Sequence, residues 1–390
     1  MKILVLGAGM YVTGRGGSGV GTVLASLVQA SKQIEIESIT VAAKSPGNKK
    51  IVADAVKRNN AKLGASLKAG FVSVDVAGPE FVRFLRANRF AAAIICLPDH
   101  MHFKAAQTLI SQGIHCLMVK PLTPTLGEAR RLVALQKKKK VYAAVEFHKR
   151  LDETNLFIKR ALADKVLGDV LYFTVDYSQQ IHIPVSTFKS WAGKTNIFQY
   201  LGVHYVDLIY FLTGYIPVRA MAYGTRNLLV SRGINTYDSI HAMVEWQDPR
   251  RKNKFFISNL NTNWIDPDNT SALSDQKYKV VGTKGRMECD QKNRGLELVQ
   301  ERLGTRQINP YFSEYLLDAS GRMRFGGYGY KSILIFLADV QDLGLRVTDL
   351  TTLEKSRPSF TQALVSTAVI DVVTQSLKNQ SQWKMIHGPF

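Results

Sequence analysis

A lysine directly precedes a proline at the end of an apolar run, where Lys120 and Pro121 follow Cys116–Val119. Short apolar runs of this kind are typical of buried strands in a parallel sheet. Ligands bind at the carboxyl ends of such strands, so an ammonium group at this point is well placed to contact one. A lone Lys-Pro pair more often marks a surface loop, and here the motifs around it favour the ligand contact.

Glycines follow the first apolar run of the chain. Gly7 and Gly9, with Met10 next, match the start of the G-x-G-x-x-G dinucleotide fingerprint, although Val12 stands at the third glycine. A second set, Gly14–Gly19, matches the full spacing. Such glycines let the backbone approach a pyrophosphate, whose charge the following helix stabilises. We predict a phosphate turn at Gly7, Gly9 and Met10 and an inserted Gly-rich loop, with a surface loop that binds nothing as the alternative.

The end of the second apolar run bears on the choice of cofactor. An acidic residue there would hydrogen-bond the ribose 2′-hydroxyl of NAD. Lys44 and Ser45 stand there instead, Lys49 and Lys50 follow, and the segment holds no carboxylate. Lysine and serine suit a 2′-phosphate, whereas an acid would repel it. The sequence therefore favours NADP, with NAD as the alternative and an ordinary basic loop as the interpretation without a ligand.

A proline and a polar cluster follow the fourth apolar run, in the segment Leu97-Pro98-Asp99-His100-Met101-His102. This composition predicts a turn, and the turn falls at the ligand edge of the sheet. His100 or His102 then either contacts the cofactor or serves as a structural histidine that caps a helix. The sequence does not decide between these roles.

Tyr200 and His204 are spaced to share one face of a helix, which the apolar periodicity predicts over residues 200–212. Oxidation of a secondary alcohol removes a hydride from carbon and a proton from oxygen. Histidine titrates near neutral pH and can take that proton. The Lys120 ammonium would stabilise the developing alkoxide. We predict His204 as the general acid/base and Tyr200 as a substrate-orienting residue; alone, His204 would more often be a core histidine.

The elements that must position these residues fall into two groups. The first part of the chain alternates short apolar runs with helical periodicity, which indicates βαβ units and a parallel sheet. After about residue 148, apolar alternating runs succeed one another without intervening helices, which favours an antiparallel sheet. We predict an α/β protein with a doubly wound, dinucleotide-binding Rossmann domain over residues 1–148. An α+β substrate-binding and oligomerisation domain with an open, mostly antiparallel sheet follows over 149–390.

The charge balance is strongly basic, since 51 Lys and Arg against 31 Asp and Glu give a net charge of +20. Such a field attracts anionic ligands. The basic residues are spread along the chain, and the one dense run, 137–140, falls at a predicted helix end, so no specific nucleic-acid partner is expected. No apolar run approaches the roughly 18 residues of a membrane helix. Three cysteines without pair spacing indicate reduced thiols, a cytoplasmic location and no metal site.

These motifs together resemble the Gfo/Idh/MocA family, named for glucose–fructose oxidoreductase, inositol dehydrogenase and rhizopine catabolism. The resemblance covers essentially the whole chain and rests on the Gly-rich turn, the segment 97–102, Lys120-Pro121 and the later segment Gly202–Leu208. In that family a Glu-Lys-Pro motif supplies a lysine that contacts the nicotinamide and the substrate. Lys120 matches that lysine, with Val119 in place of the glutamate.

Two further family patterns can be placed on this sequence. The pattern T-P-x-x-x-H maps onto Leu97, Pro98 and His102, with one departure at Leu97. An Asp-x-x-x-His pair matches at His204, whereas Tyr200 stands where aspartate is usual. A tyrosine hydroxyl still donates or accepts a hydrogen bond. The resemblance thus implies cofactor contacts at Leu97, Pro98, His102 and Lys120.

The resemblance implies an NAD(P)-dependent oxidoreductase that acts on a hydroxyl or keto carbon of a sugar, sugar nucleotide or related polyol. It also implies a homodimer or homotetramer. The departures at Val12, Val119 and Tyr200 leave one alternative, a dinucleotide-binding sensor of the same fold that has lost catalysis.

Overall fold

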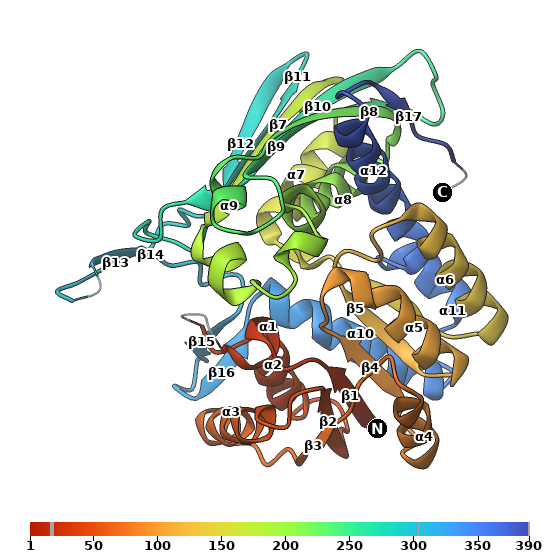
Figure 1. The fold of residues 1–390 in the computed structure, drawn as a ribbon, viewed down its shortest axis with the longest axis vertical. Helices are drawn as coiled ribbons and strands as arrows, with labels where there is room; N and C mark the ends of the chain where they lie inside the picture. The colour runs from red at the N-terminus through yellow and green to blue at the C-terminus, as the bar shows by residue number, and fades with distance from the viewer. Residues whose placement is uncertain (16–18, 303, 389–390) are drawn as a thin grey trace. The chain divides into compact units, whose positions relative to one another are not determined.

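The computed structural model describes residues 1–15, 19–302 and 304–388, and the chain divides into two compact units (Figure 1). Unit 1 consists of Met1–Thr123, Gly127–Leu151 and Tyr311–Ala363. Unit 2 consists of Pro124–Leu126, Asp152–Pro310 and Leu364–Phe390. Unit 1 therefore takes in a long segment from late in the chain in addition to the predicted N-terminal region. A domain boundary at residue 148 stays a proposal.

A six-stranded parallel sheet forms the centre of unit 1, in the order β3-β2-β1-β4-β5-β6. The order reverses between β1 and β4, which makes this the doubly wound sheet that the sequence predicts. β4 is wholly buried and β1 nearly so, because helices cover both faces. The strands are β1 (Lys2–Leu6), β2 (Ser38–Ala43), β3 (Ala69–Ser73), β4 (Ala92–Ile95), β5 (His115–Val119) and β6 (Ala143–Glu146).

The helices of unit 1 come from both ends of the chain. The late segment contributes α10, whose Ile333, Phe336 and Leu337 share one apolar core with Val23 and Leu27 of α2. The helices are α1 (Met10–Thr13), α2 (Val23–Ala30), α3 (Asn48–Leu63), α4 (Pro79–Ala87), α5 (His102–Ser111), α6 (Leu126–Lys139), α10 (Tyr328–Gly344) and α11 (Leu350–Ser356). Two short strands, β15 (Glu314–Leu317) and β16 (Met323–Gly326), pair before α10.

A seven-stranded mixed sheet forms the centre of unit 2, in the order β12-β11-β7-β10-β9-β8-β17. Neighbouring strands are antiparallel except for β7 and β10, which run parallel. The sheet is therefore mostly antiparallel, as the sequence predicts. Its strands are β7 (Val170–Gln180), β8 (Ile216–Thr225), β9 (Ser239–Gln247), β10 (Phe255–Asp266), β11 (Ser274–Gly282), β12 (Gly285–Asp290) and β17 (Lys384–Met385).

One face of this sheet is buried and the other is open. Along β10, buried and partly exposed residues alternate, as expected for a sheet that is covered on one side. Figure 1 shows α7 (Glu153–Ala163), α8 (Val203–Thr213) and most of α12 (Phe360–Lys378) beneath the sheet. The short helix α9 (Leu228–Ser231) and the hairpin of β13 (Glu297–Gln300) and β14 (Gly304–Gln307) complete unit 2. Within the described residues, no helix is long and apolar enough to cross a membrane.

Candidate active site

The predicted cofactor residues of unit 1 all follow strands of the parallel sheet. Gly7 comes directly after β1, Lys44 after β2 and Lys120 after β5, while Leu97 stands two residues beyond β4. Because the strands are parallel, these positions lie along one edge of the sheet, on both sides of the reversal between β1 and β4. The structure therefore places one set of predicted residues along this carboxyl edge: Gly7, Gly9, Met10, Lys44, Ser45, Leu97, Pro98, His102 and Lys120.

The turn after β1 requires glycine for a steric reason. Gly7 has a φ of +99°, and a Cβ built there would lie 2.2 Å from the carbonyl oxygen of Cys96. Gly9 has an extended backbone and precedes α1, and a Cβ at Gly9 would meet nothing within 4 Å. The backbone is thus open at Gly9 and tightly held at Gly7, which suits the approach of a phosphate group.

The second glycine set closes an inserted loop on itself. A Cβ at Gly14 would lie 2.3 Å from the carbonyl oxygen of Gly19, and a Cβ at Gly21 would lie 2.5 Å from the amide nitrogen of Gly14. Gly14 and Gly21 also have positive φ angles of +82° and +80°. Residues 16–18 of the predicted motif lie outside the described residues. Val12, at the third glycine position, lies in α1 and is buried in one core with Val23 and Leu24 of α2, so an apolar side chain fills the place of the usual glycine.

An acid from the neighbouring strand end, missed in the sequence, lies beside the end of β2. Asp75, which follows β3, forms an ion pair with Lys44 at 3.1 Å. The backbone N–H of Ala77 and the Lys44 ammonium lower the pKa of this carboxyl group. Asp75 reaches Lys44 because β3 lies beside β2 in the sheet. The residues that follow β2 in the sequence include no carboxylate, so they alone do not reveal this acid.

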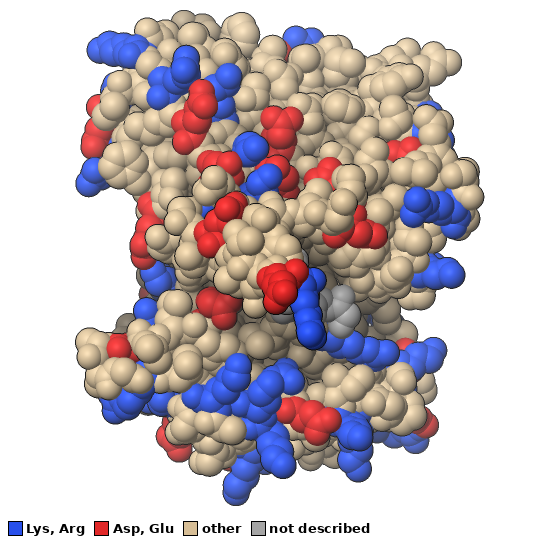
Figure 2. Space-filling view, turned by 90° about the vertical axis from the view of Figure 1, so that its left-hand side faces the viewer, with Lys and Arg blue, Asp and Glu red and all other residues tan. Residues whose placement is uncertain are grey.

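Basic side chains surround the same region. Figure 2 shows many Lys and Arg side chains on the lower part of the molecule. In Figure 1, α3 lies at the same height, in the lower part of the view. α3 begins four residues after Lys44 and carries five basic side chains against a single acidic one. Its basic residues are Lys49, Lys50, Lys57, Arg58 and Lys62. Lys49 and Lys50, on the first turn of α3, are the ones that follow the β2 end closely in sequence, and Asp75 neutralises Lys44 there in part.

Lys120 is buried at the carboxyl edge, with 9% of its surface exposed. Burial lowers its pKa from the usual range to about 8, while the negative charges of Asp99 and Glu146 act in the opposite direction. The peptide bond between Lys120 and Pro121 is cis. An ammonium of this kind is still mostly protonated at neutral pH, and it is weakly hydrated, so it can act strongly on a nearby developing charge.

His102 joins two turns of this edge. Its Nδ1 lies 2.7 Å from the carbonyl oxygen of Pro121 and its Nε2 lies 2.8 Å from that of Leu97. The ring is fully buried, and a neutral imidazole can donate to only one of these oxygens. These contacts are structural, but they are not the helix cap that the sequence left open, because the ring joins the turn at Leu97 to the turn at Lys120. Contact of His102 with the cofactor stays a prediction.

Glu146, at the end of β6, is a second acid that the sequence analysis missed. It is 2% exposed and accepts hydrogen bonds from the Tyr11 hydroxyl at 3.1 Å and the Ser332 hydroxyl at 2.5 Å. His148 Nδ1 lies 3.0 Å from its other oxygen. Burial first, and the charge of Glu146 second, raise the pKa of Tyr11, so its phenol is neutral. A single charge at the end of the apolar run 141–147 is the signal that would have identified it.

Tyr200 and His204 lie in unit 2, on two differently wound turns. Tyr200 belongs to a π-helical turn, Phe198–Gly202, whereas His204 belongs to α8. The predicted helix over 200–212 therefore begins at Val203 as α8, and a shared face for the two residues stays a prediction because a π turn spaces its partners five apart. A Cβ at Gly202 would lie 2.7 Å from the ring of Phe198, so the turn requires glycine.

Aromatic rings surround Tyr200. Its ring centroid lies 5.2 Å from that of Phe188, 5.5 Å from that of Trp264 and 6.2 Å from that of Trp191. His204 is buried, and its ring lies 6.5 Å from that of Tyr177. Because Trp264 and Phe188 are themselves buried, these contacts hold the Tyr200 ring in place, while the residue as a whole is partly exposed.

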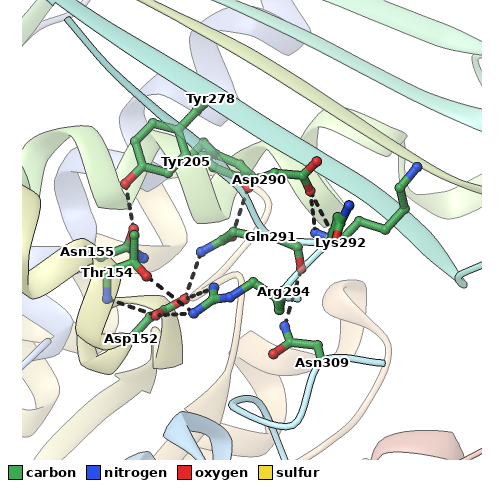
Figure 3. A network of polar contacts seen from close by, with 11 residues as sticks. Asp152, Thr154, Asn155, Tyr205, Tyr278, Asp290, Gln291, Lys292, Arg294 and Asn309 are labelled. Carbon is green, nitrogen blue, oxygen red and sulfur yellow. Dashed lines mark hydrogen bonds and ion pairs between the residues drawn. The ribbon is translucent and has the colours of Figure 1, made fainter. Parts of the chain in front are cut away.

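A buried polar network fixes the segment that carries His204 (Figure 3). Asp152 caps the start of α7 and receives hydrogen bonds from Arg294 at 2.9 and 3.1 Å and from Gln291 at 3.0 Å. Gln291 in turn accepts a hydrogen bond at 3.0 Å from Tyr205, the neighbour of His204. The network thus ties α7 and α8 to the loop after β12. Within the part of the chain that the structure describes, no group of acids, histidines and cysteines is arranged to hold a metal ion.

Comparison of the sequence with known protein families tests the resemblance to the Gfo/Idh/MocA family. Residues 1–147 match the oxidoreductase family with an NAD-binding Rossmann fold, and residues 156–288 match the GFO/IDH/MocA C-terminal domain. The chain belongs to the Gfo/Idh/MocA family. The two matches cover most of the chain and correspond to the parallel sheet of unit 1 and to most of the mixed sheet of unit 2.

Individual relatives in this family are distant. The chain is 31% identical over 121 residues to the uncharacterized oxidoreductase YhhX of Escherichia coli (strain K12), covering 31% of this chain and 34% of that protein. It is 26% identical over 155 residues to scyllo-inositol 2-dehydrogenase (NADP(+)) IolW of Bacillus subtilis (strain 168), covering 39% and 42%. Both alignments span less than half of the relative's length.

Among solved structures, the scyllo-inositol dehydrogenase from Lactobacillus casei with bound NAD(H) and scyllo-inositol has the same fold. It aligns with a TM-score of 0.66 at 14% identity and covers 99% of each chain. At this identity the likeness shows the fold alone.

Proposed function

We propose that this protein is an NAD(P)-dependent oxidoreductase that transfers a hydride between the nicotinamide and a hydroxyl or keto carbon of a sugar, sugar nucleotide or related polyol. The observation that carries the proposal is Lys120, a buried ammonium on the same sheet edge as a glycine turn that is open to a phosphate. Inositol and sugar dehydrogenases among the relatives support the substrate class.

The residues of unit 1 fit a dinucleotide. The open backbone at Gly9, next to Met10, and the positive-φ turn at Gly7 suit the pyrophosphate, and Lys44 and Ser45 suit the adenosine ribose. The turn Leu97-Pro98, which His102 fixes to the Lys120 turn, faces the nicotinamide half in this proposal. When bound, the cofactor supplies the hydride acceptor or donor.

The chain's own residues manage charge and protons. With a pKa of about 8, Lys120 remains an ammonium at neutral pH and stabilises negative charge on the substrate oxygen. We propose His204 as the group that takes or returns the hydroxyl proton. Tyr200, set among aromatic rings, orients the substrate through its hydroxyl in place of the aspartate usual in the family.

The choice of NADP over NAD is part of the proposal. The NADP-dependent relative and the two lysines of the first turn of α3, Lys49 and Lys50, support NADP. The ion pair between Lys44 and Asp75 works against it, because the carboxylate partly neutralises the charge that a 2′-phosphate would meet.

The net charge of +20 also suits an anionic substrate.

We also propose a homodimer or homotetramer in the cytoplasm. Large apolar side chains, including Tyr172, Tyr223 and Phe255, stand on the open face of the unit 2 sheet and are 36–64% exposed. An exposed apolar face of this kind is typical of an interface between copies. Cys96, Cys116 and Cys289 form no disulfide in the part of the chain that the structure describes, which fits a reducing compartment. Light scattering after size-exclusion chromatography measures the mass, and a monomer would contradict the first part.

The activity is tested with a panel of sugars, polyols and sugar nucleotides and both oxidised cofactors, followed by the absorbance of the reduced nicotinamide. Lys120→Met is expected to lower kcat by roughly a hundredfold or more while the protein stays folded. Lys104→Ala, which removes an exposed lysine of α5, is the matched control and should leave kcat unchanged. Cofactor binding without turnover across the whole panel would instead favour a sensor.

A further inference from the structure

Position 119 lacks the glutamate that precedes the lysine in the family's Glu-Lys-Pro motif, and an acid stands directly beside it. In the pairing of β5 with β6, Val119 is aligned with Glu146. Aligned residues of neighbouring parallel strands put their side chains on the same face, with the strands roughly 5 Å apart. A carboxylate at position 146 therefore occupies the neighbourhood that a carboxylate at position 119 would occupy.

Hydrogen-bond contacts hold the Glu146 carboxylate in this position. Its two carboxylate oxygens face the hydroxyls of Tyr11 and Ser332 and the Nδ1 of His148. The ring of His148 is in turn held against Phe312 at 5.0 Å. A buried carboxylate is costly without such partners, and an apolar side chain at the end of β6 would have continued the strand at no such cost.

Several titratable groups surround Lys120. Asp99 of the turn after β4 and Glu146 of β6 are the acids that favour its charged form, while His102 of α5 also faces it. Near Glu146, the thiol of Cys96 and the phenol of Tyr11 have raised pKa values, chiefly through burial, so both are neutral at neutral pH. Among these groups, the two carboxylates are the ones whose negative charge favours the ammonium of Lys120, and Asp99 and Glu146 lie on either side of β5 in the sheet order.

We propose that Glu146 replaces the carboxylate missing at position 119 and keeps Lys120 an ammonium, as a positioning residue that acts through the lysine. The consequence for turnover rests on the proposed function, whereas the charge of Lys120 does not depend on a substrate. The proposal separates Glu146 from a purely structural acid, because a structural acid would stabilise the fold without changing the titration of Lys120.

The direct test is an NMR titration of cofactor-free protein with lysine carrying ¹³C at Cε, in which the Lys120 signal is assigned with Lys120→Arg. In the wild type the midpoint is expected at about 8. Glu146→Gln should lower it by roughly one unit, since a nearby opposite charge is lost. The double variant Val119→Glu/Glu146→Gln, which returns the acid to the family position, should recover at least half of that shift.

A control variant and a second variant make the test decisive. Glu354→Gln removes a different acid of unit 1, one that binds Gln136, and should leave the midpoint unchanged. The double variant Val119→Glu/Glu146→Gln tests the same geometry if Glu146→Gln does not fold, because it keeps one acid in this place; its midpoint should lie within roughly half a unit of the wild-type value. An unchanged midpoint in Glu146→Gln, or a midpoint in the double variant that is lower than the wild-type value by roughly one unit or more, would overturn the proposal.

Turnover gives an independent readout. In Glu146→Gln the fall of kcat at high pH should begin at lower pH than in the wild type, and Val119→Glu/Glu146→Gln should move it back. Wild-type protein that shows the expected titration without turnover would count against the proposed function alone. If turnover is normal and the midpoint of the Lys120 titration is the same in the wild type and in Glu146→Gln, only the role of Glu146 is contradicted.

Discussion

Loss of Asp152 is expected to destabilise unit 2 strongly, because it leaves a buried guanidinium without its carboxylate. The side chains of Asp152 and Arg294 are 1% and 9% exposed, and two N–H···O contacts join them. Removal of one partner from such a pair costs about 3–5 kcal/mol. Asp152→Ala also removes the cap of α7 and the acceptor for Gln291, so the upper half of this range applies.

The four tryptophans provide an assay for this unit alone. Trp191, Trp246, Trp264 and Trp383 all belong to unit 2, so their fluorescence in a urea titration reports its unfolding. A loss of about 4 kcal/mol corresponds to a fall of roughly 10 °C in Tm for a unit of this size. The exposed pair of Arg286 and Glu288 gives a matched control, and Glu288→Ala should change stability by about 0–1 kcal/mol.

The double variant Asp152→Ala/Arg294→Met tests whether the charge of Arg294 causes the loss of stability in Asp152→Ala. It removes the unpaired charge, so it should be more stable than Asp152→Ala by about 2 kcal/mol or more. Because the network holds the neighbour of His204, Asp152→Ala should also lower kcat at temperatures where unit 2 remains folded. If Asp152→Ala lost no more stability than Glu288→Ala, the network would not be what fixes α7 and α8.

At the end of β2, Asp75→Asn is expected to raise the affinity for NADPH relative to NADH, because Lys44 loses its ion-pair partner; calorimetric titrations that show an unchanged ratio would refute this. Gly7→Ala should weaken binding of either cofactor roughly tenfold or more, since its Cβ would lie 2.2 Å from the Cys96 carbonyl oxygen, and retained tight binding would contradict the steric argument. The value of kcat should fall as the pH rises through about 8, since Lys120 is an ammonium below this pH and a neutral amine above it; a profile that stays flat well above this value would remove Lys120 from the mechanism.

Local pattern was enough to predict the sheet edge. Short apolar runs and the residues that follow them place Gly7, Lys44 and Lys120 at strand ends, and a parallel sheet must bring strand ends to one side. These inferences need only neighbours along the chain.

Features that depend on pairing between distant segments could not be predicted. Asp75 meets Lys44 because β3 lies beside β2, and Glu146 aligns with Val119 because β6 lies beside β5. Periodicity likewise does not distinguish a parallel from an antiparallel neighbour, so the parallel pairing of β7 with β10 was not foreseen. The π turn at Tyr200 has a different origin, since the apolar periodicity does not distinguish a π turn from an α-helical one and the close approach of Gly202 to the ring of Phe198 is a contact within the turn.

The most direct test of the central claim is a single-turnover measurement of hydride transfer with the best substrate from the panel. Wild-type protein and Lys120→Met are each saturated with cofactor, as verified by titration, and then mixed with substrate. We predict rapid reduction of the nicotinamide by the wild type and a rate lower by roughly a hundredfold or more in Lys120→Met, although both proteins are saturated with cofactor. Equal rates in the two proteins would contradict the role assigned to Lys120.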